Sequence, residues 1–354
     1  MKNRVLMVSM TPFFGGGEAF CVKLAKVLEG RYELGAAIAD PHLSELLGLL
    51  GIPVWALSRV LLRVPVARYP GAALVIARAI REFKPDVVHL NGQSENYFAR
   101  IPWSLGVPAI SIRHTNFDAS VSSFKRYLAA RSLRAIEKTV CVSSMLKQQL
   151  SGVVDERKLT VIQNWIDPLP QASTYIPPKA GEPFRLLYVG RLVRDKGIFD
   201  LIEAVRKVEN VLLTVVGDGT DSNEVRVSAS GLPIKFEGFH ADCSSFYQKA
   251  HLLVFPSFWE GHPLVPIEAM AHGLPCLLSD IPVNRETADH EQAAELFECG
   301  NTEDLAAKIR SLQNDSSRLL SLSEYGVCQV QRHYTKNQAM ERYFKVFDEA
   351  IATH

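Results

Sequence analysis

The chain has 354 residues, of which 47% are hydrophobic and 22% are charged, and its formal net charge is +1. This length exceeds one ordinary hydrophobic core and fits two domains of about 170 residues each, and the composition is that of an ordinary soluble globular protein. No apolar run approaches the ~18 residues that a membrane-spanning helix needs. The start, MKNRVLMVSM, runs into a glycine loop without a small-residue cleavage site, so it predicts a first strand and not a signal peptide.

The small net charge hides an asymmetry between the two halves. Residues 1–180 carry 22 Lys and Arg against 13 Asp and Glu, whereas residues 181–354 carry 17 against 25. A basic half can bind phosphates or an anionic membrane surface, and an acidic half tempers nonspecific binding. The six cysteines have neither CxxC nor metal-ligand spacing, which favours reduced thiols and a cytoplasmic protein.

Short apolar runs, each followed by a turn and a helix-like stretch, recur along the whole chain. This alternation predicts parallel sheets covered by helices on both faces. In the first half the predicted strands are residues 4–10, 87–91, 109–114, 139–143 and 160–164, and in the second half they are 185–190, 211–217, 234–239, 252–257 and 276–280.

The two series are separated by a segment with five prolines and no clear periodicity. We therefore predict one domain over residues 1–168, a linker over 169–183 and a second domain over 184–335. An amphipathic helix over residues 336–354 follows. In open α/β sheets ligands bind beyond the carboxyl ends of the strands, so we expect the chemistry in the loops that follow the strands and in a cleft between the domains.

The loop after the first strand contains Gly15, Gly16, Gly17 and Glu18. Glycines let a backbone approach a ligand closely, and N–H groups at a helix start bind anions, although a turn needed for steric reasons fits these residues equally well. The strand over residues 109–114 ends at His114, which is either structural or a hydrogen-bonding partner for a sugar hydroxyl.

In the second half, Arg191 and Lys196 follow the strand over 185–190 and precede a helix. Two cations at a helix start can neutralise a diphosphate, most strongly as negative charge builds on a leaving group, whereas a solvated charge is the alternative. The loop with Gly217 and Asp218 and the later segment Glu237-Gly238-Phe239 are expected to flank a nucleobase.

The segment VFPSFWEGHPLVPIEAMAHGLPCLLSDIPVNRE places Glu260 after a strand and Glu268 eight positions later. We predict that Pro266 is the first residue of a helix, which puts Glu268 in the first turn, where an ionised carboxylate is favoured and can bind a vicinal diol such as a ribose. A capping box would be the structural alternative, but Val265 stands where that motif needs Ser or Thr.

The run from Phe255 to Glu286 resembles the signature of family-four glycosyltransferases, which are retaining enzymes of GT-B fold with paired glutamates that flank a sugar nucleotide. The GRL and DKG segments around Arg191 and Lys196 resemble that family's diphosphate clamp. The resemblance implies an α/β protein of GT-B architecture, in which two Rossmann-like, doubly wound parallel-sheet domains face an interdomain cleft. It also implies that the terminal helix returns to the first domain.

The resemblance implies a role for each candidate residue. Catalysis is expected from Glu260, His114, Arg191 and Lys196. Donor binding is expected from Gly15, Gly16, Gly17, Glu18, Arg191, Lys196, Gly217, Asp218, Glu237, Phe239, Glu260, Gly261, His262, Leu264, Val265 and Glu268.

Two departures from the family pattern stand out. His262-Pro263 replaces a common Phe-Gly pair, and Trp165 replaces a usual Gly after Asn164. Because proline has no N–H, phosphate or sugar contacts must come from neighbouring amides, and the first departure leaves the donor sugar open. For the second segment we expect a hinge and packing role.

The expected reaction is retaining transfer of a sugar from a UDP- or GDP-linked donor to a glycan or lipid-linked acceptor hydroxyl, in bacterial surface polysaccharide or glycolipid assembly. No metal site is expected, since no Asp-x-Asp motif or ligand cluster is present and the Arg and Lys pair can replace a divalent ion. A nucleotide-sugar epimerase of the same fold and a non-catalytic nucleotide-sugar-binding subunit are the alternatives.

The basic stretches 59–68 and 125–138 mix Arg and Lys with apolar residues. This mixture indicates either solvated helix faces or peripheral binding to an anionic membrane, here the inner face of the cytoplasmic membrane. Nucleic-acid binding is not expected, because no recognition motif is present.

Overall fold

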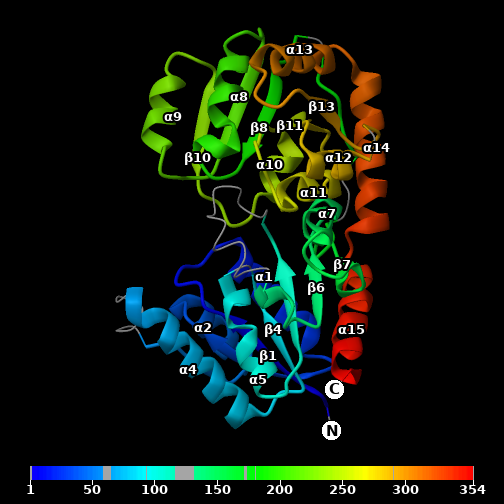
Figure 1. Cartoon of the computed structure of the whole chain (residues 1–354). Coiled ribbons are helices and arrows are strands. Elements are labelled where there is room, and N and C mark those ends of the chain that lie inside the picture. The colour runs from blue at the N-terminus through cyan, green and yellow to red at the C-terminus, as the bar shows by residue number, and fades with distance from the viewer. Residues whose placement is uncertain are drawn as a thin grey trace. The chain divides into compact units, whose positions relative to one another are not determined.

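The computed structural model describes residues 2–58, 65–92, 94–115, 131–170, 174–179, 181–289 and 291–353 (Figure 1). The chain forms two compact units. The first contains Met1–Ile162 and Met340–His354, and the second contains Gln163–Ala339. The described part of residues 169–183, which the sequence predicts as a linker, is grouped with the second unit.

In the described residues of the first unit, a seven-stranded sheet has the order β3-β2-β1-β4-β5-β6-β7. Every neighbouring pair is parallel, so each connection has to cross over the sheet. The side chains of β1 are buried from Val5 to Ser9, as expected for a strand covered on both faces. The strands are β1 Arg4–Ser9, β2 Glu33–Ile38, β3 Val54–Ala56, β4 Val87–Leu90, β5 Ala109–Arg113, β6 Lys138–Cys141 and β7 Leu159–Val161.

The second unit contains, over its described residues, a six-stranded sheet of order β10-β9-β8-β11-β12-β13, again with parallel pairs throughout. Leu186 and Tyr188 of β8 enter one hydrophobic cluster, whereas Leu187 and Val189 enter another. Successive side chains therefore point to opposite faces, and both faces are packed. The strands are β8 Phe184–Val189, β9 Val211–Val216, β10 Ile234–Gly238, β11 Leu252–Phe255, β12 Cys276–Ser279 and β13 Glu295–Phe297. These two sheets confirm the predicted α/β architecture.

Helices connect the strands of both sheets (Figure 1). In the first unit they are α1 Gly16–Leu28, α2 Pro41–Leu49, α4 Pro65–Phe83, η1 Ser94–Phe98, α5 Arg100–Ser104, α7 Ser144–Ser151 and η2 Glu156–Lys158. In the second unit they are η3 Arg194–Lys196, α8 Ile198–Val205, α9 Ser222–Ser228, α10 Ser244–Lys249, α11 Leu264–Ala271, α12 Pro282–Ala288, α13 Thr302–Gln313 and α14 Ser316–His333. The final helix is α15 Lys336–Ala352.

The final helix packs on the first unit through its second half. Tyr343 and Phe347 are fully buried, and Asp348 accepts hydrogen bonds from Tyr32 Oη at 2.7 Å and from Arg31 Nη2 at 2.6 Å. Lys138 Nζ lies 2.8 Å from Glu349 Oε2. Burial of the apolar side chains and these polar contacts together attach the second half of α15 to the first unit.

Three strands of the structure are absent from the predicted set. β2 has the sequence ELGAAI, in which Gly and Ala stand where β-branched residues usually mark a strand. β3 and β13 have three residues each, which is too short for a hydrophobic alternation to show. The ten predicted strands are all present, with one to three residues of each predicted carboxyl end lying in the following loop.

Glu295 on β13 ties this edge of the second sheet to two helices. Its carboxylate oxygens lie 2.7 Å from Lys308 Nζ of α13 and 2.7 Å from Arg318 Nη2 of α14. Burial alone would raise the pKa of Glu295, but the hydrogen bonds from both cations outweigh burial and hold it below its ordinary value. These pairs therefore stabilise the fold above the ordinary carboxyl pKa and lose that effect as the pH falls through the lowered value.

Candidate functional site

In the second unit, the loops after β8 and β11 bring Lys196 and Glu260 together. Lys196 Nζ and Glu260 Oε1 form an ion pair, and each side chain is only 14% exposed. The ammonium group also lies 5.5 Å from the centroid of the Trp259 ring. A charged pair with little solvent exposure interacts strongly, and its geometry is fixed by the two loops that carry it.

Glu260 is held by hydroxyl groups that the sequence did not single out. Ser257 Oγ donates to Glu260 Oε1 at 2.8 Å, and Ser279 Oγ donates to the Ser257 carbonyl at 2.5 Å. Asn284 Nδ2 in turn donates to the Ser279 carbonyl at 2.9 Å. This chain of buried hydrogen bonds from β12 and α12 orients the carboxylate.

Gly197 allows the two loops to approach each other closely. Its φ of +67° lies in the left-handed region, and a β-carbon there would overlap the Pro256 carbonyl oxygen and come within 2.9 Å of Pro256 Cβ. The amide of Phe258 donates to the Asp195 carbonyl at 3.0 Å across the same contact. Only glycine satisfies both the backbone conformation and the contact, so this residue sets the position of Lys196 relative to Glu260.

Glu268 lies two residues further into its helix than the sequence predicts. α11 begins at Leu264 with Pro263 as the N-cap, so Pro266 is the third helical residue and Glu268 the fifth. The first-turn prediction is wrong because proline fits any position whose N–H has no acceptor in the preceding turn, and the third position qualifies. Glu268 Oε2 instead accepts a hydrogen bond from Tyr247 Oη at 2.9 Å.

The loop between the two glutamates is buried. The His262 carbonyl accepts a hydrogen bond from Asn164 Nδ2 at 2.7 Å, and the His262 ring packs 5.3 Å from the ring of Tyr334. Burial lowers the pKa of His262 to about 3, so the ring is neutral at pH 7. Gly261 is buried. Leu264 and Val265, the first two helical residues, are partly exposed, and their N–H groups have no acceptor within the helix.

Two further predicted donor residues of the second unit, Arg191 and Asp218, lie in the loops after β8 and β9. Arg191 is exposed, and its carbonyl accepts a hydrogen bond from Tyr188 Oη at 2.9 Å. Asp218 accepts from Ser222 Oγ and from the Gly219 amide, so its carboxylate shapes its own loop.

Gly217 has a φ of +137°, and a β-carbon there would overlap the Gly190 carbonyl oxygen. Glu237 Oε1 lies 2.6 Å from Lys235 Nζ. Phe239 is 77% exposed, so its ring offers a free face at the end of β10.

In the first unit, the glycine-rich loop and His114 are neighbours. Asn91 Nδ2 donates to the Gly17 carbonyl at 2.9 Å. A β-carbon added to Gly17 would lie 4.0 Å from Cδ2 of the His114 ring. The His114 ring also meets Phe20 of α1 edge-on, with 4.6 Å between centroids. Burial, with Arg113 alongside, lowers the pKa of His114 to about 4, so a neutral ring is present at pH 7.

Gly15, Gly16 and Glu18 form the start of α1. Glu18 Oε2 accepts a hydrogen bond from the Gly15 amide at 3.1 Å, and its Oε1 accepts from Ser9 Oγ at 3.2 Å. The carboxylate is thus turned inward as a helix cap, whereas Gly16, the first helical residue, is exposed. A role for Glu18 toward a donor remains a prediction.

Of the predicted basic stretches 59–68 and 125–138, residues 59–64 and 125–130 lie outside the described residues. Within the described part of the chain, no helix is both long enough and apolar enough to cross a membrane. The described residues also contain no cluster of three or more His, Cys, Asp or Glu arranged to hold a metal ion.

Two long stretches of the chain match known family models. Residues 175–327 match the model described as Glycosyl transferases group 1, and residues 14–168 match the one described as Glycosyltransferase Family 4. The lipopolysaccharide core biosynthesis glycosyltransferase LpsD of Rhizobium meliloti (strain 1021) is 25% identical over 350 residues, which cover 96% of each chain.

Solved structures agree on the fold. The structure of Anabaena HepE in complex with UDP superposes with a TM-score of 0.83 at 19% identity, over 99% of this chain and 100% of that one. The HepE complex with UDP-glucose gives the same TM-score over 98% and 99%. With both family models matched in sequence order, two parallel-sheet units in the structure and neighbours of the same fold, the chain belongs to the family-four-like glycosyltransferases of GT-B fold.

Proposed function

We propose that this glycosyltransferase is a retaining, metal-independent enzyme that moves a sugar from a nucleoside diphosphate sugar to a hydroxyl of a glycan or lipid-linked acceptor. The cellular role proposed is bacterial surface polysaccharide or lipopolysaccharide synthesis, which the name of the Rhizobium meliloti relative supports. A UDP-linked or GDP-linked donor is proposed, and the UDP and UDP-glucose complexes of HepE favour the first.

The observation that carries this proposal is the Lys196–Glu260 pair. An ammonium group held at the start of a helix, in a place with little water, stabilises the negative charge of a departing nucleoside diphosphate. Arg191, exposed on the loop before it, adds a planar guanidinium that suits the same diphosphate. These two cations supply the charge that a divalent metal supplies in other enzymes, and metal independence is proposed on that reasoning.

The other residues orient the donor. Glu260, fixed by Ser257, is proposed to bind hydroxyls of the transferred sugar, and Glu268, with Tyr247 behind it, to bind the ribose. For His114 we propose a hydrogen bond from its neutral ring to a sugar hydroxyl. No carboxylate is assigned as a nucleophile: the acceptor attacks on the face from which the diphosphate leaves, the glycosidic bond to phosphate breaks, and the diphosphate takes the acceptor's proton.

Donor binding is tested by a thermal-shift panel of UDP, GDP, ADP and their sugar conjugates in the presence of EDTA. We expect one nucleotide and its conjugates to raise the melting temperature by several degrees, since a ligand that binds only the folded state stabilises it. EDTA should leave both this shift and transfer unchanged. Loss of transfer in EDTA would contradict metal independence, and absence of any shift would contradict the donor site itself.

With the donor known, the anomeric configuration of the product is read from the proton coupling of the new linkage by NMR. Retention is the expected result, and inversion would contradict the proposed stereochemistry. Conversion of the donor to another sugar nucleotide without an acceptor would instead indicate an epimerase.

We further propose that the protein works in the cytoplasm, bound peripherally to the cytoplasmic membrane. The neighbouring helices α4 and α5 present exposed apolar side chains, Leu74 at 72% and Trp103 at 63%, together with exposed Arg81 and Arg100. Apolar and basic groups together suit an anionic lipid interface. We expect cosedimentation with anionic liposomes at low salt, weakened by 0.5 M salt, and none with neutral liposomes; failure to sediment with either would remove this proposal.

A further inference from the structure

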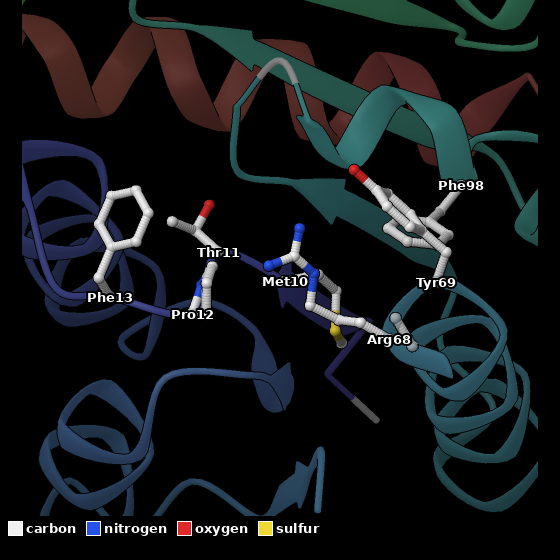
Figure 2. Close-up of a pocket in the computed structure, with 8 residues that line it drawn as sticks. Met10, Thr11, Pro12, Phe13, Arg68, Tyr69 and Phe98 are labelled. Atoms are coloured by element: carbon white, nitrogen blue, oxygen red, sulfur yellow. The ribbon is translucent and has the colours of Figure 1, made fainter. Parts of the chain in front are cut away.

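A small pocket of about 210 Å³ opens in the first unit beside the end of β1. One wall is the segment that follows β1, and the other comes from the start of α4 and from η1 (Figure 2). The lining residues are Met10, Thr11, Pro12, Phe13, Arg68, Tyr69, Ala72 and Phe98. The pocket therefore lies at a carboxyl strand end, where open α/β sheets bind ligands, and the chain runs from it into the glycine-rich loop at Gly15.

The wall after β1 is held in place by a buried carboxylate. Glu95 is fully buried, and its Oε1 accepts hydrogen bonds from the Met10 amide at 2.9 Å and from Thr11 Oγ1 at 3.3 Å. These bonds leave the oxygen of Thr11 able to accept a hydrogen bond from a ligand. The pocket is thus shaped before any ligand arrives.

Aromatic rings form both sides of the pocket. The rings of Tyr69 and Phe98 lie 6.3 Å apart between centroids, and Phe13 stands on the opposite side with 67% of its surface exposed (Figure 2). Aromatic faces pack against the C–H face of a sugar ring, while hydroxyls such as that of Tyr69 bind its polar edge.

Arg68 supplies the charge of the pocket. Figure 2 shows its guanidinium between Phe13 on one side and Tyr69 and Phe98 on the other. The Arg68 Cζ lies 5.4 Å from the Tyr69 ring centroid, and Arg68 forms no ion pair with a carboxylate of the described residues. A guanidinium that is not paired with a carboxylate can bind the phosphate or carboxylate of a ligand with two parallel hydrogen bonds.

The volume limits what can enter. Pockets for drug-sized ligands measure about 300–1,000 Å³, so this one accommodates a single sugar ring and not a sugar nucleotide. We propose that it binds the acceptor's terminal sugar and that Arg68 selects acceptors with an anionic group, a phosphate or a carboxylate, on that sugar or its neighbour. This inference rests on the proposed transfer function.

The test uses simple sugars as probes of the full-length protein. Glucose 6-phosphate, glucuronic acid, glucose and inorganic phosphate are titrated by saturation-transfer and ³¹P NMR, with and without the nucleotide that the thermal-shift panel selects. We expect both anionic sugars to bind about tenfold more tightly than glucose, and to do so with the nucleotide bound. Arg68→Gln should remove this preference.

A matched control lies on the same helix. Arg78 is 71% exposed and pairs with Glu82, so Arg78→Gln removes the same charge outside the pocket and should keep the preference. Three results would overturn the proposal. The wild type could bind charged and neutral sugars with equal affinity, the preference could survive Arg68→Gln, or Arg78→Gln could remove the preference as fully as Arg68→Gln does. Inorganic phosphate that binds as tightly as glucose 6-phosphate would overturn the sugar part.

The nucleotide shift, measured on the same samples, separates the two proposals. If the shift is present and the sugar preference absent, the pocket proposal fails alone. If the shift is absent, the donor site of the proposed function fails, and the sugar titrations without nucleotide still decide the pocket.

Discussion

Lys196→Ala is expected to lower the rate of sugar transfer by about 10²- to 10³-fold, the effect typical of removing one group that stabilises charge in a transition state. Lys196 is 14% exposed, and among the described residues it is the cation that forms an ion pair with Glu260. Transfer is measured as nucleoside diphosphate release with saturating donor, and the thermal shift caused by the nucleoside diphosphate should shrink in parallel.

The substitution also leaves the Glu260 carboxylate without its cation, which by itself destabilises a protein. The double variant Lys196→Ala with Glu260→Gln removes that unpaired charge, so it should regain melting temperature while transfer stays lost. Lys207→Ala is the matched control, because Lys207 follows the other end of α8 and pairs with Glu303 of the same unit, which is not part of the site loops. Transfer within threefold of wild type in Lys196→Ala would contradict the assigned role.

The strands that carry the site were predictable, because buried parallel strands are continuous apolar runs that end in recognisable loops. β8 and β11 are of this kind, and so Lys196 and Glu260 could be placed at strand ends from the sequence. β2, with its Gly and Ala, gives no such signal although it pairs with the inner strand β1 along six residues. Its position is decided by tertiary packing and not by local preference.

Supporting residues of the site were harder to foresee. Ser257, Ser279 and Asn284 orient Glu260 through hydrogen bonds between loops, and serine and asparagine carry no spacing that marks such a role. The start of α11 was misplaced by two residues because a proline is compatible with several first-turn positions. The inward use of Glu18 depends on loop geometry that a glycine run leaves open.

Gly197→Ala is expected to lower the free energy of unfolding of the second unit by about 2–5 kcal/mol, as the sum of two costs. A β-carbon in the left-handed region costs about 1–2 kcal/mol, and forcing apart well-packed groups costs about 1–3 kcal/mol more. The second cost applies because the added carbon would overlap the Pro256 carbonyl oxygen, which is backbone and cannot rotate away. Urea unfolding followed by tryptophan fluorescence gives the measurement, since Trp259 lies on the adjoining loop.

Gly231 isolates the first cost from the second. It has a similar φ of +76° in the same unit, but a β-carbon there would have no atom within 4 Å, so Gly231→Ala should lose only about 1–2 kcal/mol. The rate of sugar transfer should also differ between the two variants. Any backbone shift that relieves the overlap at Gly197 moves Lys196 away from Glu260, so Gly197→Ala should lower the transfer rate at least tenfold at temperatures where the protein is folded. Gly231→Ala should leave the transfer rate unchanged. Equal stability losses in the two variants would mean that the loops carrying Gly197 and Pro256 separate at little cost. The Lys196–Glu260 pair would then be positioned by the attraction between its charges and not by the backbone contact.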